Sequence, residues 1–236
     1  MKIYHASDYA DMCRRATNII SAQILLHPNS TLGFATGSTP IGIYEMLADA
    51  YKRGDIDFSG ITSFNLDEYC GLAENDPQSY HYYMNEHLFS KVNIDRNNAH
   101  VPKGNVEDIE LECKRYEELI TAHGGIDLQL LGLGNTGHIA FNEPGPVFEK
   151  DTHCVSLDEE TINANSRFFD NPSDVPRKAI TMGMKSIMQA KKILLVANGE
   201  KKKDIFQKAL HGPITPMVPA SILQLHPDLT VVWSDT

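Results

Sequence analysis

The sequence lacks the cysteine patterns that mark zinc sites and disulfide frameworks. Its four cysteines, Cys13, Cys70, Cys113 and Cys154, are widely spaced, and no C-x-x-C pair occurs. No Cys/His cluster has the spacing of a zinc site either, so we expect no metal. Reduced thiols of this kind are typical of cytosolic proteins, which favours a cytoplasmic localisation.

Long apolar runs and an excess of positive charge are also missing. No run approaches the roughly 18 apolar residues of a membrane span, and the N-terminal MKIYHASDYADM has no apolar stretch of signal-peptide length. The 21 Lys and Arg residues face 31 Asp and Glu residues, which gives a formal net charge of −10. Because a nucleic-acid backbone favours a basic face, we expect neither nucleic acid nor a membrane as partner. A small phosphorylated ligand, which needs only a few local donors, stays open.

Short apolar runs alternate with longer amphipathic segments along the 236 residues. The runs expected to form strands are Lys2–Tyr4, Thr31–Ala35, Ile61–Leu66, Ile126–Leu133, Lys192–Ala197 and Leu229–Trp233, with weaker candidates near His100, at His153–Leu157 and at Ala179–Thr181. The expected helices run from Ser7 or Asp8 to about Leu26, from Pro40 to Arg53, from Ser79 to Phe89, from Val106 (after an Asn105 cap) to Ala122, from Met182 to Ala190 and from Lys201 to His211. This alternation predicts an α/β fold with an open, mostly parallel, Rossmann-like sheet and helices on both faces. No repeat or linker interrupts it, so we expect a single domain over residues 1–236.

The segment Thr161–Pro176 fits this plan poorly. It is rich in Asn, Ser and Asp, holds two prolines, and carries Arg167 beside Phe168 and Phe169. A long polar connection in a compact domain is often a lid or binding loop. The alternative is an exposed loop with two aromatic side chains tucked under it. We expect a lid segment at about residues 158–178.

The stretch Leu128–Pro146, LQLLGLGNTGHIAFNEPGP, carries the most concentrated chemistry. An apolar run of strand length leads into a glycine-rich loop with His138 and Glu143, and open α/β sheets bind ligands at such loops. The carboxylate either orients the histidine or both side chains face water. The glycines match the dinucleotide motif G-x-G-x-x-G, but the Pro-Gly-Pro that follows stops the helix that a pyrophosphate would need. The glycines instead indicate close approach of the backbone to a small ligand.

The loop Thr36-Gly37-Ser38-Thr39-Pro40 follows a predicted strand and opens a predicted helix. Hydroxyl groups, a glycine and free backbone N–H groups at a helix N-terminus form an anion site, and phosphate is the anion that they favour. No Gly-Lys-Ser/Thr follows, so this is not a Walker A loop. An ordinary capped turn is the alternative.

Two further loops leave predicted strands at the same edge of the sheet. Asp67 and Glu68 follow the Ile61 strand; adjacent carboxylates are usually solvated, but one at this edge could be a general base if burial raises its pKa. Lys201-Lys202-Lys203 begins a helix, where lysines are poorly placed against the helix dipole, so one of them could serve an anion. Together, the loops indicate an enzyme that acts on a small phosphorylated metabolite by acid–base chemistry. No metal set, catalytic cysteine pair or Gly-x-Ser-x-Gly elbow competes with this interpretation.

Five motifs resemble those of the glucosamine-6-phosphate deaminase family, and the match is collinear over essentially the whole chain. They are Thr36-Gly37-Ser38-Thr39-Pro40, Phe64-Asn65-Leu66-Asp67-Glu68-Tyr69, Gly137-His138-Ile139-Ala140-Phe141-Asn142-Glu143-Pro144, Asn165-Ser166-Arg167-Phe168-Phe169 and Leu223-Gln224-Leu225-His226-Pro227. The combination is highly specific, although each motif alone is not.

The resemblance implies conversion of glucosamine 6-phosphate to fructose 6-phosphate and ammonia without a metal or organic cofactor. Asp67 would move the proton between C2 and C1, and His138, oriented by Glu143, would assist opening of the pyranose ring. Ser38, Thr39, Arg167 and Lys202 would bind the phosphate, together with the rest of the loop from Thr36 and Gly37. We class the expected enzyme as a hydrolase of amino sugar metabolism, in N-acetylglucosamine catabolism.

One position departs from the family pattern. Many relatives carry an acidic residue just before the Gly-His, where it completes a relay with the histidine, but this chain has Thr136. A threonine cannot carry charge, so either Glu143 alone tunes His138 or ring opening is weaker.

Two other functions compete. The 6-phosphogluconolactonase family, a group of hydrolases, shares the expected fold but shows Asp-Glu-Arg where this chain has Asp67-Glu68-Tyr69. The sugar-phosphate-sensing domain of a transcriptional regulator would need a DNA-binding segment, for which the expected strand at Lys2 leaves no room.

The resemblance also bears on regulation. Longer family members form hexamers that N-acetylglucosamine 6-phosphate activates, through basic residues after the Asn-Glu-Pro motif and a C-terminal extension. In this chain, His153 and Val155 stand where the basic pair should be, and the sequence runs only to Thr236. We therefore expect a non-allosteric enzyme that is a monomer or a small homo-oligomer.

Overall fold

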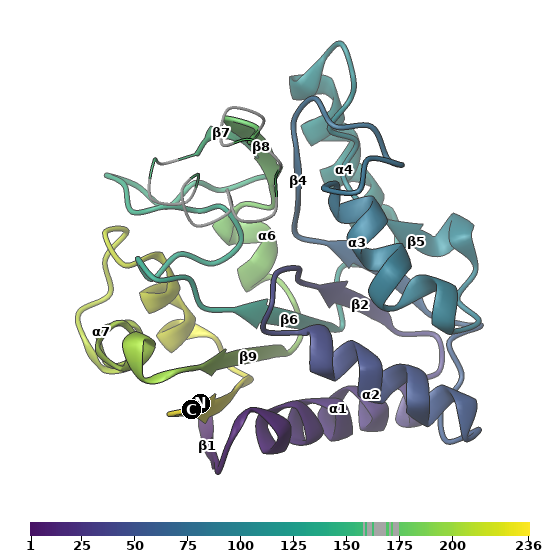
Figure 1. Cartoon of the computed structure of the whole chain (residues 1–236). Coiled ribbons are helices and arrows are strands. Elements are labelled where there is room, and N and C mark those ends of the chain that lie inside the picture. Colours follow the sequence, from purple (N-terminus) through teal and green to yellow (C-terminus); the bar gives the residue numbers. More distant parts are fainter. Residues whose placement is uncertain (158, 160–161, 163–168, 170, 172–174) are drawn as a thin grey trace.

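A seven-stranded parallel sheet frames the molecule, as shown by a computed structural model that describes residues 1–157, 159, 162, 169, 171 and 175–236. The strands lie in the order β1-β10-β9-β6-β2-β3-β5 (Figure 1), and every neighbouring pair is parallel. Their bounds are β1 (Lys2–Ala6), β2 (Thr31–Phe34), β3 (Thr62–Asn65), β5 (Ala99–His100), β6 (Leu128–Gly132), β9 (Ile193–Asn198) and β10 (Leu229–Ser234). The expectation of an open, mostly parallel α/β sheet is confirmed.

Helices cover both faces of this sheet, because successive residues of its buried strands point to opposite sides. Leu130 packs in one core cluster with residues of α1, α2 and α3, whereas the next residue, Leu131, packs in another with residues of α4, α6 and α7. The helices are α1 (Tyr9–Leu26), α2 (Ile41–Lys52), α3 (Tyr80–His87), α4 (Ile109–Ala122), α6 (Met184–Met188) and α7 (Lys203–His211). Short 3-10 turns lie at Phe89–Lys91, Arg96–Asn98, Glu200–Lys202 and Pro219–Leu225.

Side-chain caps decide where the helices begin. Asp8, not Ser7, caps α1 by accepting the N–H of Asp11 at 2.8 Å. Ser79 caps α3, as predicted, and accepts the N–H of Tyr82 at 3.0 Å. The expected Asn105 cap is wrong: the Asp108 carboxylate accepts the N–H of Leu111 at 2.9 Å, so α4 begins three residues later than expected.

A second, antiparallel sheet stands beside the C-terminal edge of the large one. It consists of β4 (Asp67–Tyr69), β8 (Lys178–Thr181) and β7 (His153–Ser156) in the order β4-β8-β7. All three weaker candidate strands of the sequence are therefore real: the one near His100 is β5 of the large sheet, and the other two, β7 and β8, belong to this separate sheet. Asp67 was expected in a loop and instead lies in a strand, opposite Thr181. This register places Asp67 rigidly beside the loops that follow β2 and β6.

The predicted lid lies mainly outside the described residues, and Arg167 and Phe168 are among those outside. Four described residues near it, Leu157, Ile162, Phe169 and Val175, pack in a third apolar cluster with Tyr69 and Phe141. The lid and the single domain over residues 1–236 stay predictions. Among the described residues, no helix combines the length and apolar character needed to cross a membrane.

Candidate functional site

A cleft of about 390 Å³ opens where β2, β3 and β6 end. The residues that line it are Ala35, Thr36, Gly37, Ser38, Thr39, Leu66, Asp67, Tyr80, Gly132, Leu133, Gly134, Asn135, His138, Ala140, Phe141 and Lys202. The four loops singled out in the sequence thus converge on one cavity, at the edge where open α/β sheets bind ligands. A larger cavity, of about 540 Å³, lies around Ser30 and Lys191 and contains none of these loops.

The loop from Thr36 to Thr39 is fixed by its carbonyl groups. The Tyr83 hydroxyl donates to the Gly37 carbonyl at 2.6 Å, and the Tyr9 hydroxyl donates to the Thr39 carbonyl at 3.1 Å. Within the described part of the chain, the N–H groups of Gly37, Ser38 and Thr39 meet no acceptor. Gly37 has a φ of +90°, which favours glycine. The loop therefore offers donors ahead of α2, as an anion site requires.

Lys202 is the lysine of the Lys201–Lys203 run that reaches the cleft. Its Nζ donates to the Leu133 carbonyl at 2.6 Å, and burial lowers its pKa. No described carboxylate forms an ion pair with it, whereas Lys203 lies 3.9 Å from Asp235 and Lys201 is exposed. A half-buried ammonium group without a counter-ion favours an anionic ligand.

Asp67 lines the cleft and is almost completely buried, with 6% of its surface exposed. Burial, and then the negative charge of Glu68, raise the pKa of Asp67 to about 8. No hydrogen bond from another described residue stabilises its carboxylate. Asp67 is therefore a group that can take or give a proton near neutral pH.

Adjacent carboxylates at a strand end are usually solvated, but Glu68 is buried here, with 1% of its surface exposed. Strand alternation turns its side chain away from Asp67 and toward the start of α3, where it accepts backbone N–H groups of Tyr80 and His81 at 2.9 and 3.0 Å. Sequence reasoning missed this role. No local signal marks it, because Glu68 lies outside the usual capping position, which Ser79 occupies.

His138, Thr136 and Glu143 form one hydrogen-bonded cluster. The His138 Nδ1 lies 3.0 Å from Glu143 Oε2 and 2.8 Å from Thr136 Oγ1, and the Thr136 hydroxyl donates to Glu143 Oε2 at 3.1 Å. These contacts suit a histidine that carries its proton on Nδ1 and leaves Nε2 for a ligand; this tautomer is assigned from the contacts. The carboxylate orients the histidine, so the alternative in which both face water is wrong.

A tight turn presents this cluster to the cleft. Ala140 has a φ of +53°, the left-handed region that costs a non-glycine residue energy and recurs at functional sites. Asn142 closes the turn by donating from Nδ2 to the carbonyls of Ile139 and Met182. A Cβ on Gly134 would lie 2.0 Å from His138 Nε2, so this glycine makes room for the imidazole ring rather than for a ligand. A Cβ on Gly132 would meet nothing within 4 Å, which fits the expected ligand space.

Tyr80 and Phe141, to which the sequence analysis gave no role of their own, also line the cleft. Tyr80 and Phe141 stack with ring centroids 6.1 Å apart, and Tyr69 packs against both rings. Tyr80 follows a correctly predicted cap, but its place in the cleft depends on how α3 packs. Among the described residues, no group of three His, Cys, Asp or Glu side chains could hold a metal ion.

Comparisons with known proteins agree over the whole chain. Residues 6–233 match the family model of glucosamine-6-phosphate isomerases/6-phosphogluconolactonase. A glucosamine-6-phosphate deaminase of Lachnoclostridium phytofermentans is 63% identical, over 98% of this chain and 98% of its own. One of Thermoanaerobacter pseudethanolicus is 52% identical, over 98% of this chain and 92% of its own.

Solved structures give the same picture. A monomeric glucosamine-6-phosphate deaminase superposes with a TM-score of 0.97 at 43% identity, covering 99% of this chain and 97% of its own. A 6-phosphogluconolactonase of Thermotoga maritima superposes with a TM-score of 0.79 at 22% identity, covering 100% of this chain and 99% of its own. The second likeness shows the fold alone.

One expectation needs correction. We classed the enzyme as a hydrolase, whereas the relatives at 63% and 43% identity are deaminases. The lactonase alternative is likewise not favoured, since its representatives share only the fold. From the family model and these relatives, the chain belongs to the family of glucosamine-6-phosphate isomerases and 6-phosphogluconolactonases, in which it is an enzyme of the deaminase group.

Proposed function

We propose that this chain converts glucosamine 6-phosphate to fructose 6-phosphate and ammonia, with Asp67 as the base. The observation that carries the proposal is the buried carboxylate of Asp67, which accepts no hydrogen bond from the described residues, in a cleft whose rim holds Lys202 and the Thr36–Thr39 loop. An anchor for an anion and a proton acceptor in one cavity suit a phosphorylated sugar that must lose a proton from carbon.

The phosphate binds to the N–H and hydroxyl groups of the Thr36–Thr39 loop and to Lys202. The loop donors meet no acceptor in the described chain, and the Lys202 ammonium has no carboxylate partner there. A dianionic phosphate would satisfy both at once. Arg167, which lies outside the described residues, adds a further cation from the lid in this proposal.

Asp67 moves the proton between C2 and C1 once the sugar ring is open. Its pKa of about 8 places it near the operating pH, where a general base combines ionisation with proton affinity. Isomerisation of the aldose to the ketose level turns C2 into an imine. Water then adds to this imine, the C–N bond breaks, and the nitrogen leaves as ammonia while C2 becomes the ketone.

His138 assists ring opening through Nε2, while Glu143 accepts the Nδ1 proton in a hydrogen bond whose Nδ1 and Oε2 atoms lie 3.0 Å apart. Thr136 takes part without charge: its hydroxyl bonds Glu143 and approaches Nδ1, so it fixes both partners of the pair. The neutral Thr136 therefore positions the imidazole ring, and Glu143 supplies the negative charge beside it.

A lid at residues 158–178 closes over the site in this proposal, within a single domain that works in the cytoplasm. Its support is the apolar cluster that joins Leu157, Ile162 and Phe169 to Tyr69 and Phe141, since Phe141 also lines the cleft.

Ammonia release from glucosamine 6-phosphate, coupled to fructose 6-phosphate formation, tests the proposal. We expect turnover by the purified chain, and loss of most of it in Asp67→Asn. Lactone hydrolysis is measured in parallel with 6-phosphogluconolactone. Turnover of the lactone without ammonia release would refute the proposed function.

A further inference from the structure

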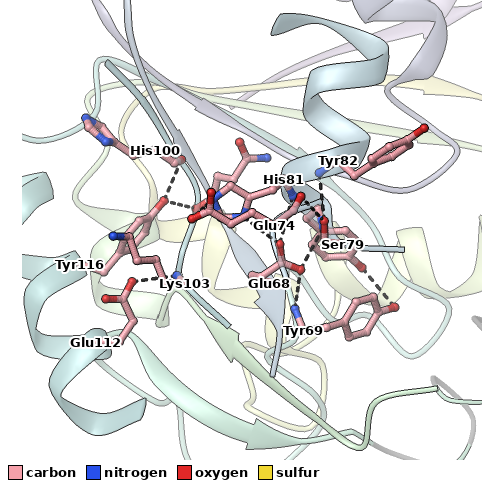
Figure 2. A network of polar contacts seen from close by, with 12 residues as sticks. Glu68, Tyr69, Glu74, Ser79, His81, Tyr82, His100, Lys103, Glu112 and Tyr116 are labelled. Carbon is pink, nitrogen blue, oxygen red and sulfur yellow. Dashed lines mark hydrogen bonds and ion pairs between the residues drawn. The ribbon is translucent and has the colours of Figure 1, made fainter. Parts of the chain in front are cut away.

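Asp67 begins a row of titratable side chains that runs from the cleft to the opposite side of β4. Glu68 follows it in the strand and points the other way, and His81 on α3 lies beyond Glu68. Figure 2 shows Glu68 and His81 together with Glu74, which approaches the far side of the imidazole ring.

Glu68 is bonded entirely by donors. Its Oε1 accepts the N–H groups of Tyr69 and Tyr80 at 2.8 and 2.9 Å, and its Oε2 accepts the N–H of His81 at 3.0 Å. The His81 Nδ1 lies 3.1 Å from the same Oε2. Three backbone N–H groups thus donate to the Glu68 carboxylate, and a ring nitrogen of His81 stands at a fourth position around it. Glu68 therefore places a negative charge immediately behind the base.

His81 is placed to neutralise that charge. Its Nδ1 faces Glu68, and its Nε2 lies 3.7 Å from Glu74 Oε1, so carboxylates stand at both ring nitrogens. The ring also borders a cavity of about 900 Å³ that is lined by three cations, Arg96, Lys103 and Arg115. Of these, Arg115 is already paired with Glu112. This cavity opens His81 to solvent.

We propose that His81 and Glu68 are a positioning pair that sets the charge state of Asp67, His81 by neutralising Glu68. The inference rests on the proposed function, in which Asp67 is the base. An ionised Asp67 is opposed by the neighbouring Glu68 charge, and a cationic His81 relieves that opposition. The pair acts through Asp67 and does not touch the substrate.

Among the described residues, the pair of Glu68 and His81 is the main electrostatic neighbour of Asp67. Burial raises the pKa of the nearby tyrosines, which are therefore neutral: Tyr44, Tyr69, Tyr80 and Tyr116. The charged or titratable groups that share the cleft with Asp67 are His138 and Lys202.

The same pair also ties the base to the phosphate loop. Glu68 holds the first residues of α3, and Tyr83 on that helix donates to the Gly37 carbonyl at 2.6 Å. A change at Glu68 can therefore disturb folding of this corner as well as charge. His81 is the cleaner residue to test.

The experiment compares pH profiles of kcat/KM for the full chain and for His81→Asn. The asparagine amide reproduces the Nδ1 donor to Glu68 but cannot carry a charge. We expect the acid limb of the profile to move to higher pH by about one unit, with activity lost about tenfold along that limb and recovered at high pH. Tyr82→Phe, a matched change at an exposed ring on the same helix, should leave the profile unchanged.

Glu68→Gln should move the acid limb in the opposite direction, provided that the variant folds. ¹³C NMR of the Asp67 carboxyl, titrated without substrate, should report both shifts independently of turnover. A loss of activity in His81→Asn that is equal at all pH values, or an unmoved limb, would overturn the proposal. Absence of ammonia release by the unmodified enzyme would instead refute the proposed function, so the two failures are distinguishable.

Discussion

At the residue scale, the buried carboxylate of Asp67 governs pH dependence. With a pKa of about 8, it is protonated in the free folded enzyme below that pH, so kcat/KM should rise with pH and level off above about 8. In the unfolded chain the carboxyl ionises near 3.8. The folded state therefore holds an extra proton between these two values, and the stabilising contribution of Asp67 falls as pH rises through that window.

The Asp67→Asn variant separates the effect of Asp67 on turnover from its effect on the pH dependence of stability. Loss of a positioned base should lower kcat by about 10²–10⁴, while binding of the phosphorylated ligand stays nearly intact. Because asparagine carries no charge to desolvate, the variant should gain stability relative to the parent as pH rises from 5 to 9 in urea unfolding. Near-normal turnover would mean that another group is the base.

The second prediction at the residue scale concerns the hydroxyl group of Thr136. Thr136→Val removes the hydroxyl that bonds Glu143 and His138 but keeps the side-chain shape, so we expect kcat to fall about tenfold, as for one lost hydrogen bond to a charged group. Thr136→Ser keeps the hydroxyl and is the control. Glu143→Gln should cost more and shift the pH profile, because a neutral amide stabilises an imidazolium less. Equal activity of the valine and serine variants would contradict a positioning role for the hydroxyl.

At the scale of elements, we expect the 3-10 turn Glu200–Lys202 before α7 and the loop before α2 to bind the phosphate together. Lys202→Met should raise KM for glucosamine 6-phosphate by about tenfold to a hundredfold, the effect of one charge-assisted contact, with a smaller change in kcat. Lys201→Met, the exposed neighbour, should behave as the parent. Unphosphorylated glucosamine should be a very poor substrate of both variants. Similar efficiency on the two sugars would exclude this phosphate site.

At the scale of the whole molecule, we predict a non-allosteric enzyme that is a monomer or a small homo-oligomer. The stretch expected to bind an activator holds His153 and Val155 in β7, and His153 contacts the Asp151 carbonyl of its own chain. Light scattering should give the mass of a monomer or of a small oligomer, and saturation should be hyperbolic with or without N-acetylglucosamine 6-phosphate. A sigmoidal curve that this compound makes hyperbolic, from a hexamer-sized particle, would contradict the prediction.

The sequence by itself determined the main sheet and the edge at which the candidate site residues meet. Alternating apolar runs and helix patterns are local signals, and parallel strands bring their C-terminal loops together, so Ser38, Asp67, His138 and the run Lys201–Lys203 could be assigned to one edge. The Asp8 and Ser79 caps also depend only on residues three positions away.

Only the tertiary structure decided the burial, the hydrogen-bond partners and the pKa of the side chains at that edge. Asp67 lies in a strand because β4 pairs with β8, more than a hundred residues further on, and that pairing buries it. Glu68 finds its donors on α3, and Lys202, rather than its neighbours, reaches the Leu133 carbonyl. Burial and long-range contacts set the pKa of each group, and local sequence patterns carry no information about either.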